Sequence, residues 1–522
     1  MLFALHGEKV SQIAAAVKLQ VRSGEGRGPS ELVKRLMLEA AEISKQREPL
    51  LQQLQEVAGV TEEELLAFER EELSEKLPFS QSMWRDQILQ SRATVDLDEL
   101  AAEALHRLSV RVSPTWLREQ AEYPFRLDET FTRRPVHIVN GIRVNDCMSK
   151  TGQNRFAQMM LLCKDHLDKR IDLDFFSASL LIPELAALGN SLEEIESLGP
   201  EGIRKLEDLQ KLAPDAVSAT VFELLVGSAC IAKGTAAELL PETKDSKVPD
   251  LRLHGFGGVP VVIECKRRLG LGEYELREAA LIEQLYENSA QWFRERGIYG
   301  CIEASFIHEV EQVKQEDWTA AVRQAVRAGR SSHDWGEVRF VELPAVRAIE
   351  FTRIYSQSFL EAAYGWQAYE EDWDGILCEV NPTDSLGIEL VRRPICLKWK
   401  STSEVAMLKK ARGITSLWHR AMKQIPPGEI GFIYIAYPEG ARTQLADERT
   451  KHILETLPEV SHEWYVQVPA TVISRLYPRA LGEGRPDLIE NVLPGVAPGE
   501  EHWLKYLPHL VFAREFSLNR GA

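Results

Sequence analysis

Apolar residues follow two different spacings along the chain. Before about residue 236 they recur every three to four positions, which is the spacing of one helix face. After that point short apolar runs of four to eight residues appear, and such runs are typical of strands. We therefore expect an α/β protein with a large helical N-terminal region at 1–130 and a helical connecting region at 131–214.

The N-terminal region carries signals for helix starts. Ser30 is placed to cap one helix, and Thr61 followed by Glu64 is a capping-box pattern. Acidic residues crowd the segment from 62 to 72. We interpret this region as a solvated helical surface, with a partner-binding or autoinhibitory module as the alternative.

The middle of the chain predicts an ordered series of elements. They are a helix at 216–232, strands at 238–241, 250–253 and 259–266, a helix at 273–295 and a strand at 298–307. Strands flanked by helices predict α/β layer packing. We place this α-β-β-β-α-β series in one domain at 215–345.

A second series in the C-terminal part resembles the first. A strand at 394–400, a helix at 405–424 and a strand at 430–437 are expected, followed by a helix at 449–457 and a strand at 464–468. The segment 346–522 is therefore expected to be a mixed α/β domain. It is either a degenerate repeat of the middle domain or an unrelated βαβ layout, which also arises without duplication.

The composition is that of a globular protein. The chain has 522 residues, 44% of them hydrophobic and 27% charged, so more than one core is expected. It has no apolar run of membrane-spanning length and no signal-peptide pattern at its start. The seven cysteines stand singly, so neither a zinc site nor a disulfide framework is indicated, and we expect a reduced, cytoplasmic protein. The net charge of −17 argues against non-specific coating of nucleic acid but allows a local basic patch.

Two carboxylates and a lysine mark the candidate chemistry. Asp250 precedes a Gly-rich turn at 255–258, and an apolar run then leads to Glu264, Cys265 and Lys266. Residues two apart on a strand share a face, so Glu264 and Lys266 should lie together, within reach of Asp250. Such a group can hold Mg²⁺ and position a water molecule. The alternative is a Glu–Lys pair at a sheet edge without chemistry.

Pro249-Asp250, followed by Glu264-Cys265-Lys266 after an apolar strand, resembles the PD-(D/E)XK nuclease superfamily. The resemblance covers about 215–308 and implies a restriction-endonuclease-like fold with an αβββαβ core. It also implies that Asp250, Glu264 and the backbone carbonyl of Cys265 bind Mg²⁺ or Mn²⁺. Lys266 would then orient the attacking water and stabilise charge on the phosphate.

Two further residues match positions that the resemblance implies, and two arginines are candidates by their place in the chain. Glu223 corresponds to a glutamate on the first core helix, and Gln284 to a polar residue on the helix after the lysine strand. Each is otherwise an ordinary helix-surface residue. Arg267 and Arg268 follow the lysine, and because neighbouring strand residues point to opposite faces, at most one should contact phosphate.

A basic stretch runs from 392 to 423, with nine basic residues against one acidic residue. We expect its lysines and arginines to contact a nucleic-acid backbone, with Trp399 and Trp418 available to stack on bases. The alternative is a basic helix face that balances the acidic N-terminal region. The residues expected to bind are Lys398, Lys400, Lys409, Lys410, Arg412, Arg420 and Lys423.

The sequence thus predicts a Mg²⁺-dependent endonuclease that hydrolyses phosphodiester bonds of DNA, acting as a regulated restriction or phage-defence effector. The alternative is a non-catalytic subunit of the same fold that binds nucleic acid or serves as a scaffold. RNA as substrate, a regulatory protein partner and self-association all stay open, and no membrane partner is expected. Because phosphate-binding glycine loops are missing, no nucleotide-driven motor is expected either.

Overall fold

The computed structural model divides the chain into two compact units, of which Asp96–Ala513 contains the described residues. The helices expected after Ser30 and Thr61 lie outside the described residues. The last part of the N-terminal region forms α5 (Leu97–Ser109) and α6 (Pro114–Glu122), as expected. The structure describes residues 97–122, 136–139, 142–143, 154–169, 175–242, 248–344, 346–350, 373–378, 388–392, 394–439, 445–452, 468–481, 485–496, 501–508 and 510–512.

The described part of the connecting region is helical from Arg155 onward, as the apolar spacing predicts, but the expectation of a helical region from 131 is wrong at its start, where Val136–Val139 and Ile142–Arg143 form strands. Its helices are α7 (Arg155–Leu167), α8 (Phe175–Asn190), α9 (Leu192–Ser197), α10 (Pro200–Asp208) and α11 (Pro214–Ala232). Proline opens both α10 and α11, where its missing N–H is not needed and its fixed φ angle suits a helix. These two helices carry residues of the candidate site.

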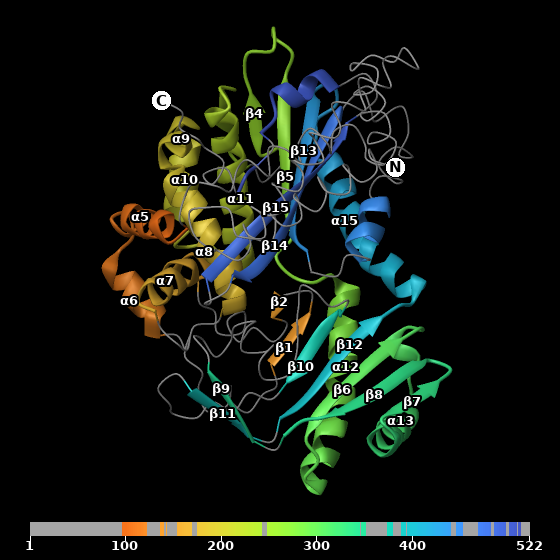
Figure 1. The fold of residues 1–522 in the computed structure, drawn as a ribbon. Coiled ribbons are helices and arrows are strands. Elements are labelled where there is room, and N and C mark those ends of the chain that lie inside the picture. The colour runs from red at the N-terminus through yellow and green to blue at the C-terminus, as the bar shows by residue number, and fades with distance from the viewer. Residues whose placement is uncertain are drawn as a thin grey trace, which may run out of the picture. The chain divides into compact units, whose positions relative to one another are not determined.

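A mixed six-stranded sheet contains the central motif (Figure 1). Its order is β15-β14-β13-β5-β4-β3. β4 pairs antiparallel with β5, whereas β13 lies parallel on the other side of β5. The strands are β3 (Ala237–Leu239), β4 (Leu251–Leu253), β5 (Val261–Arg267), β13 (Ile430–Pro438), β14 (Ala470–Leu481) and β15 (Arg485–Val496).

A mixed seven-stranded sheet has the order β2-β1-β10-β12-β6-β8-β7. Here β10 is antiparallel and β6 parallel to the central strand β12. A separate two-stranded sheet pairs β9 (Val346–Glu350) with β11 (Ile388–Arg392). The strands of the larger sheet are β1 (Val136–Val139), β2 (Ile142–Arg143), β6 (Gly300–Phe306), β7 (Arg330–His333), β8 (Gly336–Glu342), β10 (Gly375–Cys378) and β12 (Ile395–Ser401).

The two sheets exchange strands. After β5 the chain forms α12 (Glu273–Arg296) and enters the seven-stranded sheet as β6. After β12 it forms α15 (Glu404–Met422) and enters the six-stranded sheet as β13. The run at 298–307 is thus a strand, as expected, but the expectation that it pairs in the sheet of β5 is wrong. A boundary at 345 therefore does not separate the two sheets.

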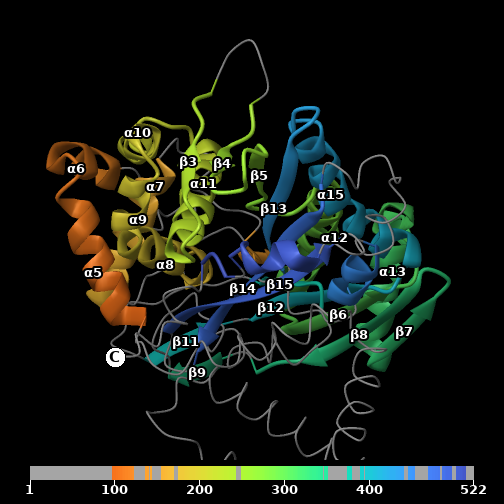
Figure 2. The same cartoon turned by 90° about the horizontal axis from the view of Figure 1, so that it is seen from above.

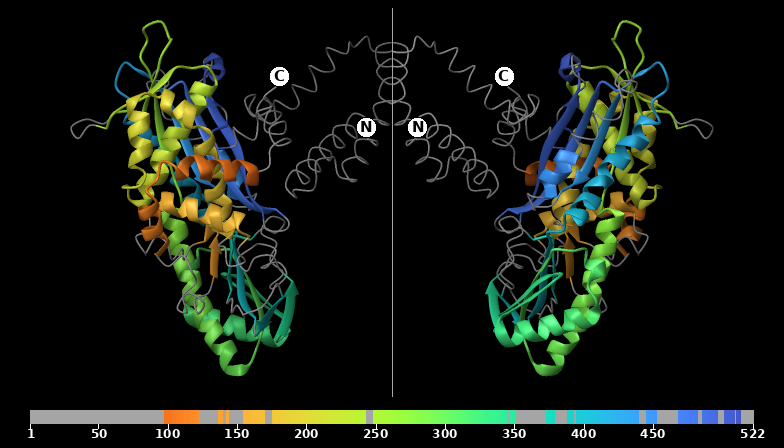
Figure 3. Two further views of the ribbon diagram at one scale, coloured as in Figure 1. Left: turned by 90° about the vertical axis from the view of Figure 1, so that its left-hand side faces the viewer. Right: turned by 90° about the vertical axis from the view of Figure 1, so that its right-hand side faces the viewer.

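Each connecting helix packs on the sheet that receives its strand. Ile282, Tyr286 and Phe293 of α12 share a buried cluster with Ile302 of β6 and Leu397 of β12. This cluster also contains residues of α13 (Gln315–Ala328), and Figure 3 shows α12 alongside the strands of the seven-stranded sheet.

The helix α15 belongs to a different cluster. Ile414 and Trp418 pack there with Val262 of β5 and Ile433 of β13. Figure 2 shows α11 and α15 on opposite sides of β5 and β13. Burial of both helix faces thus determines which sheet each exchanged strand joins.

Buried ion pairs connect the start of α12 to the segment after β13. Glu275 contacts Arg268, and its carboxylate lies 2.5 Å from the guanidinium of Arg449, which also pairs with Glu439. Burial by itself would raise the pKa of Glu275, but Arg449 and Arg268 lower it to about 2. The carboxylate is therefore ionised and tied to both exchanged segments.

Two further expectations concern membranes and cysteines. Within the described part of the chain, no helix is long and apolar enough to cross a membrane. The six cysteines that the structure describes are free and buried, in agreement with the expected lack of a disulfide framework.

Candidate active site

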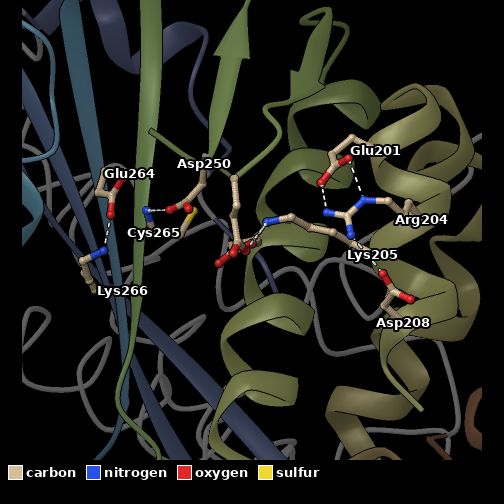
Figure 4. A network of polar contacts seen from close by, with 10 residues as sticks. Glu201, Arg204, Lys205, Asp208, Asp250, Glu264, Cys265 and Lys266 are labelled. Atoms are coloured by element: carbon tan, nitrogen blue, oxygen red, sulfur yellow. Dashed lines mark hydrogen bonds and ion pairs between the residues drawn. The ribbon is translucent and has the colours of Figure 1, made fainter. Parts of the chain in front are cut away.

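The hairpin of β4 and β5 positions Asp250 beside the strand that carries the lysine (Figure 4). The backbone N–H of Asp250 donates to the carbonyl of Ile263 at 3.1 Å. Its carboxylate accepts the N–H of Cys265 at 2.7 Å, so the side chain is held beside the backbone of β5. The turn that makes this pairing contains Gly257 and Gly258 at φ angles of 64° and 86°, a region that favours glycine.

Glu264 and Lys266 share one face of β5, as the sequence predicts. Strand alternation puts both on the side of Val262, which packs in the cluster of α15. Glu264 is fully buried and pairs with Lys266 through one carboxylate oxygen. Its other oxygen, Oε2, is buried without a hydrogen-bond partner, which is costly for a carboxylate.

Glu223 approaches from the opposite side of the sheet. It lies on α11, which packs closely on β4, because a Cβ atom at Gly227 would lie 2.7 Å from Leu251. The carboxylate of Glu223 lies 2.5 Å from Nζ of Lys205 on α10. Glu223 and Glu264 therefore come from opposite faces and approach Asp250 from different directions.

Burial and mutual repulsion disfavour the ionised form of three acids at the site. Burial raises the pKa of Glu223, Asp250 and Glu264 to about 7 in each case. Asp250 adds to the upward shift at Glu223, and Glu264 adds to that at Asp250. Acids of different elements that shift one another's pKa in a buried place are typical of functional sites.

Lys205 is a site residue that the sequence interpretation missed. Its side chain is 4% exposed and also lies 3.5 Å from a carboxylate oxygen of the exposed Glu242. Burial alone would lower the pKa of Lys205, but the facing Glu223 outweighs it and the pKa is raised. The available signal was a lysine on the apolar face of α10, next to the buried Leu206, because lysine is seldom buried without a partner.

The donors present suit a hard divalent cation. Asp250, Glu264 and the carbonyl of Cys265 supply only oxygen, the ligand atom that Mg²⁺ and Mn²⁺ prefer. The partnerless Oε2 of Glu264 is a further reason to expect a cation. Among the described residues, however, no group of three or more His, Cys, Asp or Glu side chains is arranged to hold a metal ion. Binding therefore requires the Glu264–Lys266 pair to separate and a backbone carbonyl to contribute.

The two arginines after the lysine are already paired. The side chain of Arg267 is 1% exposed, pairs with Glu184 and lies over the ring of Phe512. Arg268 is 14% exposed and pairs with Glu275. A phosphate contact by Arg267 is ruled out by burial, and Arg268 would have to leave Glu275 to make one.

Gln284 is not at the site. It is exposed on α12, whose buried face packs on the seven-stranded sheet. It lies eleven residues into this helix, about 16 Å along its axis. The expectation that Gln284 is a site residue is therefore replaced by its alternative, an ordinary helix-surface residue.

The basic stretch does not form one surface. Lys398 and Lys410 are buried, and Lys410 lies 2.7 Å from Glu278 and 3.2 Å from Asp374. Trp399 and Trp418 are buried too, so stacking on bases is not open to them. These four expectations are corrected, because a side chain enclosed in the core cannot reach a nucleic acid.

The remaining basic residues follow α15 and the strand before it. Lys409 pairs with Glu309 at 2.6 Å, and Lys400 lies over the ring of Trp373. Three exposed residues recur at helical spacing on one side of α15 and its C-cap, which we call the α15 basic face: Arg412, Arg420 and the C-cap residue Lys423.

Comparison with known proteins finds no family model, no curated protein and no solved structure that matches this chain.

Proposed function

We propose that this chain is a divalent-metal-dependent endonuclease that hydrolyses phosphodiester bonds of DNA, in a restriction or phage-defence setting. The observation that carries the proposal is that one β-hairpin places Asp250, Glu264 and Lys266 on neighbouring stretches of backbone, with one oxygen of Glu264 buried and without a hydrogen-bond partner. Glu223 adds a third carboxylate to this buried group.

The order of the elements supports the same proposal. Taken without the segment between β5 and α15, the chain runs α11, β3, β4, β5, α15 and β13, and its last strand lies parallel to β5. This order supports the proposal because it agrees with the αβββαβ order that the resemblance implies, with the aspartate next to the second strand and the Glu-x-Lys triplet on the third. The segment 268–403 then lies between the third strand and the last helix of this series, and it carries most of the other sheet.

Each residue has a distinct task in the proposed reaction. A bound cation would polarise the phosphate and lower the pKa of a bound water. Asp250 and Glu264 would hold that cation, and burial strengthens their attraction to it. Lys266 would leave Glu264, orient the water and stabilise the charge that develops on the phosphate. Glu223 would accept a proton from the water.

A non-catalytic subunit of the same fold is the second candidate. Two observations favour it: Lys266 is paired with Glu264, and the described carboxylates do not converge on one point. In that case the α15 basic face would bind nucleic acid and the buried acids would have a structural role.

Cleavage assays test the proposed function directly. Supercoiled plasmid, linear duplex, single-stranded DNA and RNA are incubated with Mg²⁺, Mn²⁺ or EDTA. The wild type is compared with Asp250→Asn and Lys266→Met, and with Arg204→Gln as a control for an exposed charge on α10. We expect metal-dependent cleavage by the wild type and the control, and none by the other two. Equal activity in all four proteins would overturn the assignment.

A further inference from the structure

Lys205 stands apart from the other charges of α10. Its neighbour Arg204 is exposed and pairs along the helix surface with Glu201 and Asp208. Lys205 instead points inward and pairs with Glu223 of α11. Figure 4 shows that the side chains of Arg204 and Lys205 leave α10 in different directions. A buried lysine with a carboxylate at 2.5 Å is a fixed contact, since breaking such a pair leaves an uncompensated charge.

The charges around the site explain why a fixed cation is needed there. Three carboxylates, those of the fully buried Glu264 and of the partly buried Glu223 and Asp250, face two ammonium groups, those of Lys205 and Lys266. Lys266 is expected to leave Glu264 during the reaction. Lys205 is then the charge that continues to compensate the acids and to hold the carboxylate of Glu223 in place.

We propose that Lys205 is a positioning residue of the candidate active site, which holds the carboxylate of Glu223 near Asp250 and partly neutralises the acids that bind the metal. The inference rests on the proposed function and deepens it. It assigns to α10, a helix outside the αβββαβ series, a direct influence on metal affinity and on turnover.

The proposal predicts opposite effects on two measured quantities. Lys205→Gln removes a positive charge close to the metal ligands, so Mn²⁺ should bind more tightly, by at least about tenfold, because the ammonium group no longer repels the divalent ion. Glu223 loses its anchor at the same time, so kcat should fall while KM for plasmid stays near the wild-type value. Lys205→Arg keeps the charge and should retain the wild-type Mn²⁺ affinity and most of kcat.

The experiment measures Mn²⁺ binding by titration calorimetry and cleavage kinetics on supercoiled plasmid. Because Lys205→Gln leaves Glu223 buried without a partner, a second variant with Lys205→Gln and Glu223→Gln removes both charges and protects the fold. We expect this double variant to bind Mn²⁺ with wild-type affinity and to cleave slowly. Arg204→Gln is the matched control and should change neither quantity.

The outcomes separate this inference from the proposed function. If the wild type binds no Mn²⁺ and cleaves nothing, the proposed function fails. If the wild type binds Mn²⁺ in a Glu264-dependent manner but Lys205→Gln binds it equally or more weakly, Lys205 has only a structural role and the inference is overturned. Tighter binding with a lower kcat, restored by Lys205→Arg, supports it.

Discussion

Asp250 and Asp374 occupy the same position in two different sheets. Each lies just before a strand, donates its backbone N–H to a carbonyl of the neighbouring strand and accepts with its carboxylate the N–H two residues further along that strand. The partners are Ile263 at 3.1 Å and Cys265 at 2.7 Å for Asp250, and Trp399 at 2.9 Å and Ser401 at 2.7 Å for Asp374.

The two aspartates share this backbone arrangement, but the side chains around them differ. The registers place Lys400 where the first sheet has Glu264, and Thr402 where it has Lys266. Asp374 instead forms an ion pair with the ammonium group of Lys410, a positive charge that belongs to the protein itself. We infer that the chain contains two copies of one strand–helix–strand unit that exchanged their last strands, and that only the first copy carries the residues of the proposed metal site.

Matched substitutions of the two aspartates test this difference. Asparagine can still accept the backbone N–H, so only the charge is removed. We expect Asp250→Asn to abolish Mn²⁺ binding and cleavage without loss of thermal stability. Asp374→Asn should leave Mn²⁺ binding unchanged but lower the free energy of unfolding by about 2 to 4 kcal/mol, because Lys410 loses a buried partner. Mn²⁺ binding that depends on Asp374 would contradict the assignment.

The exchange of strands is the part of the fold that the sequence did not predict. The runs that became β4, β5, α12 and β6 were predicted within a few residues, because apolar spacing reports local structure. The same spacing does not say which sheet a strand joins, since both sheets offer an apolar strand as a parallel neighbour. Only the packing of α12 and α15 on different sheets decides it.

The candidate site was predictable to a similar degree. Asp250, Glu264 and Lys266 could be named because their spacing fixes their neighbours on a hairpin. The partners of buried charges could not, since they come from distant segments. Arg267 looked like a phosphate ligand until Glu184, 83 residues earlier, proved to be its partner.

Glu275 should be important for the stability of both sheets. Glu275→Ala leaves Arg268 and Arg449 buried without their shared carboxylate, so we expect a loss of about 3 to 5 kcal/mol in the free energy of unfolding. Because each sheet contains a strand from the other series, urea unfolding should remain one transition. The control Glu287→Ala, on the exposed face of the same helix, should change the free energy by less than about 0.5 kcal/mol. Two separate transitions would contradict the interlocked fold.

The buried acids predict how pH affects stability and metal binding. Burial raises the pKa of Asp250 and Glu264 to about 7, from ordinary values of 3.8 and 4.5. Between pH 4 and 7 the folded chain then binds more protons than the unfolded chain, so without metal its stability should fall as pH rises through this range. Mn²⁺ requires the ionised acids, so it should raise Tm more at pH 8 than at pH 6.

Glu264→Gln provides the control for that pH dependence. It removes one of the two titrating ligands and should abolish the Mn²⁺-induced rise in Tm at both pH values. A rise in Tm that is equal at pH 6 and pH 8 in the wild type would show that these carboxylates are not the ligands.

The α15 basic face predicts a salt-dependent contact with DNA. Arg412, Arg420 and Lys423 are exposed on one side of α15 and its C-cap, and this helix packs on the side of β5 where Glu264 and Lys266 lie. If all three contact phosphates, replacing them with alanine should reduce the slope of log affinity against log salt by about 2 to 3. Duplex binding without metal, measured by fluorescence anisotropy at several salt concentrations, gives this slope.

A control with the same change in net charge decides whether position or total charge matters. Arg296, Arg323 and Arg327 are exposed on α12 and α13, helices of the seven-stranded sheet. Their replacement by alanine should leave the slope unchanged. Salt screens the attraction between DNA and distant charges of the protein, whereas the slope reports charges that contact phosphates directly. Equal losses in both triple variants would indicate that net charge alone governs binding, and the α15 basic face would then have no specific role in holding DNA near Lys266.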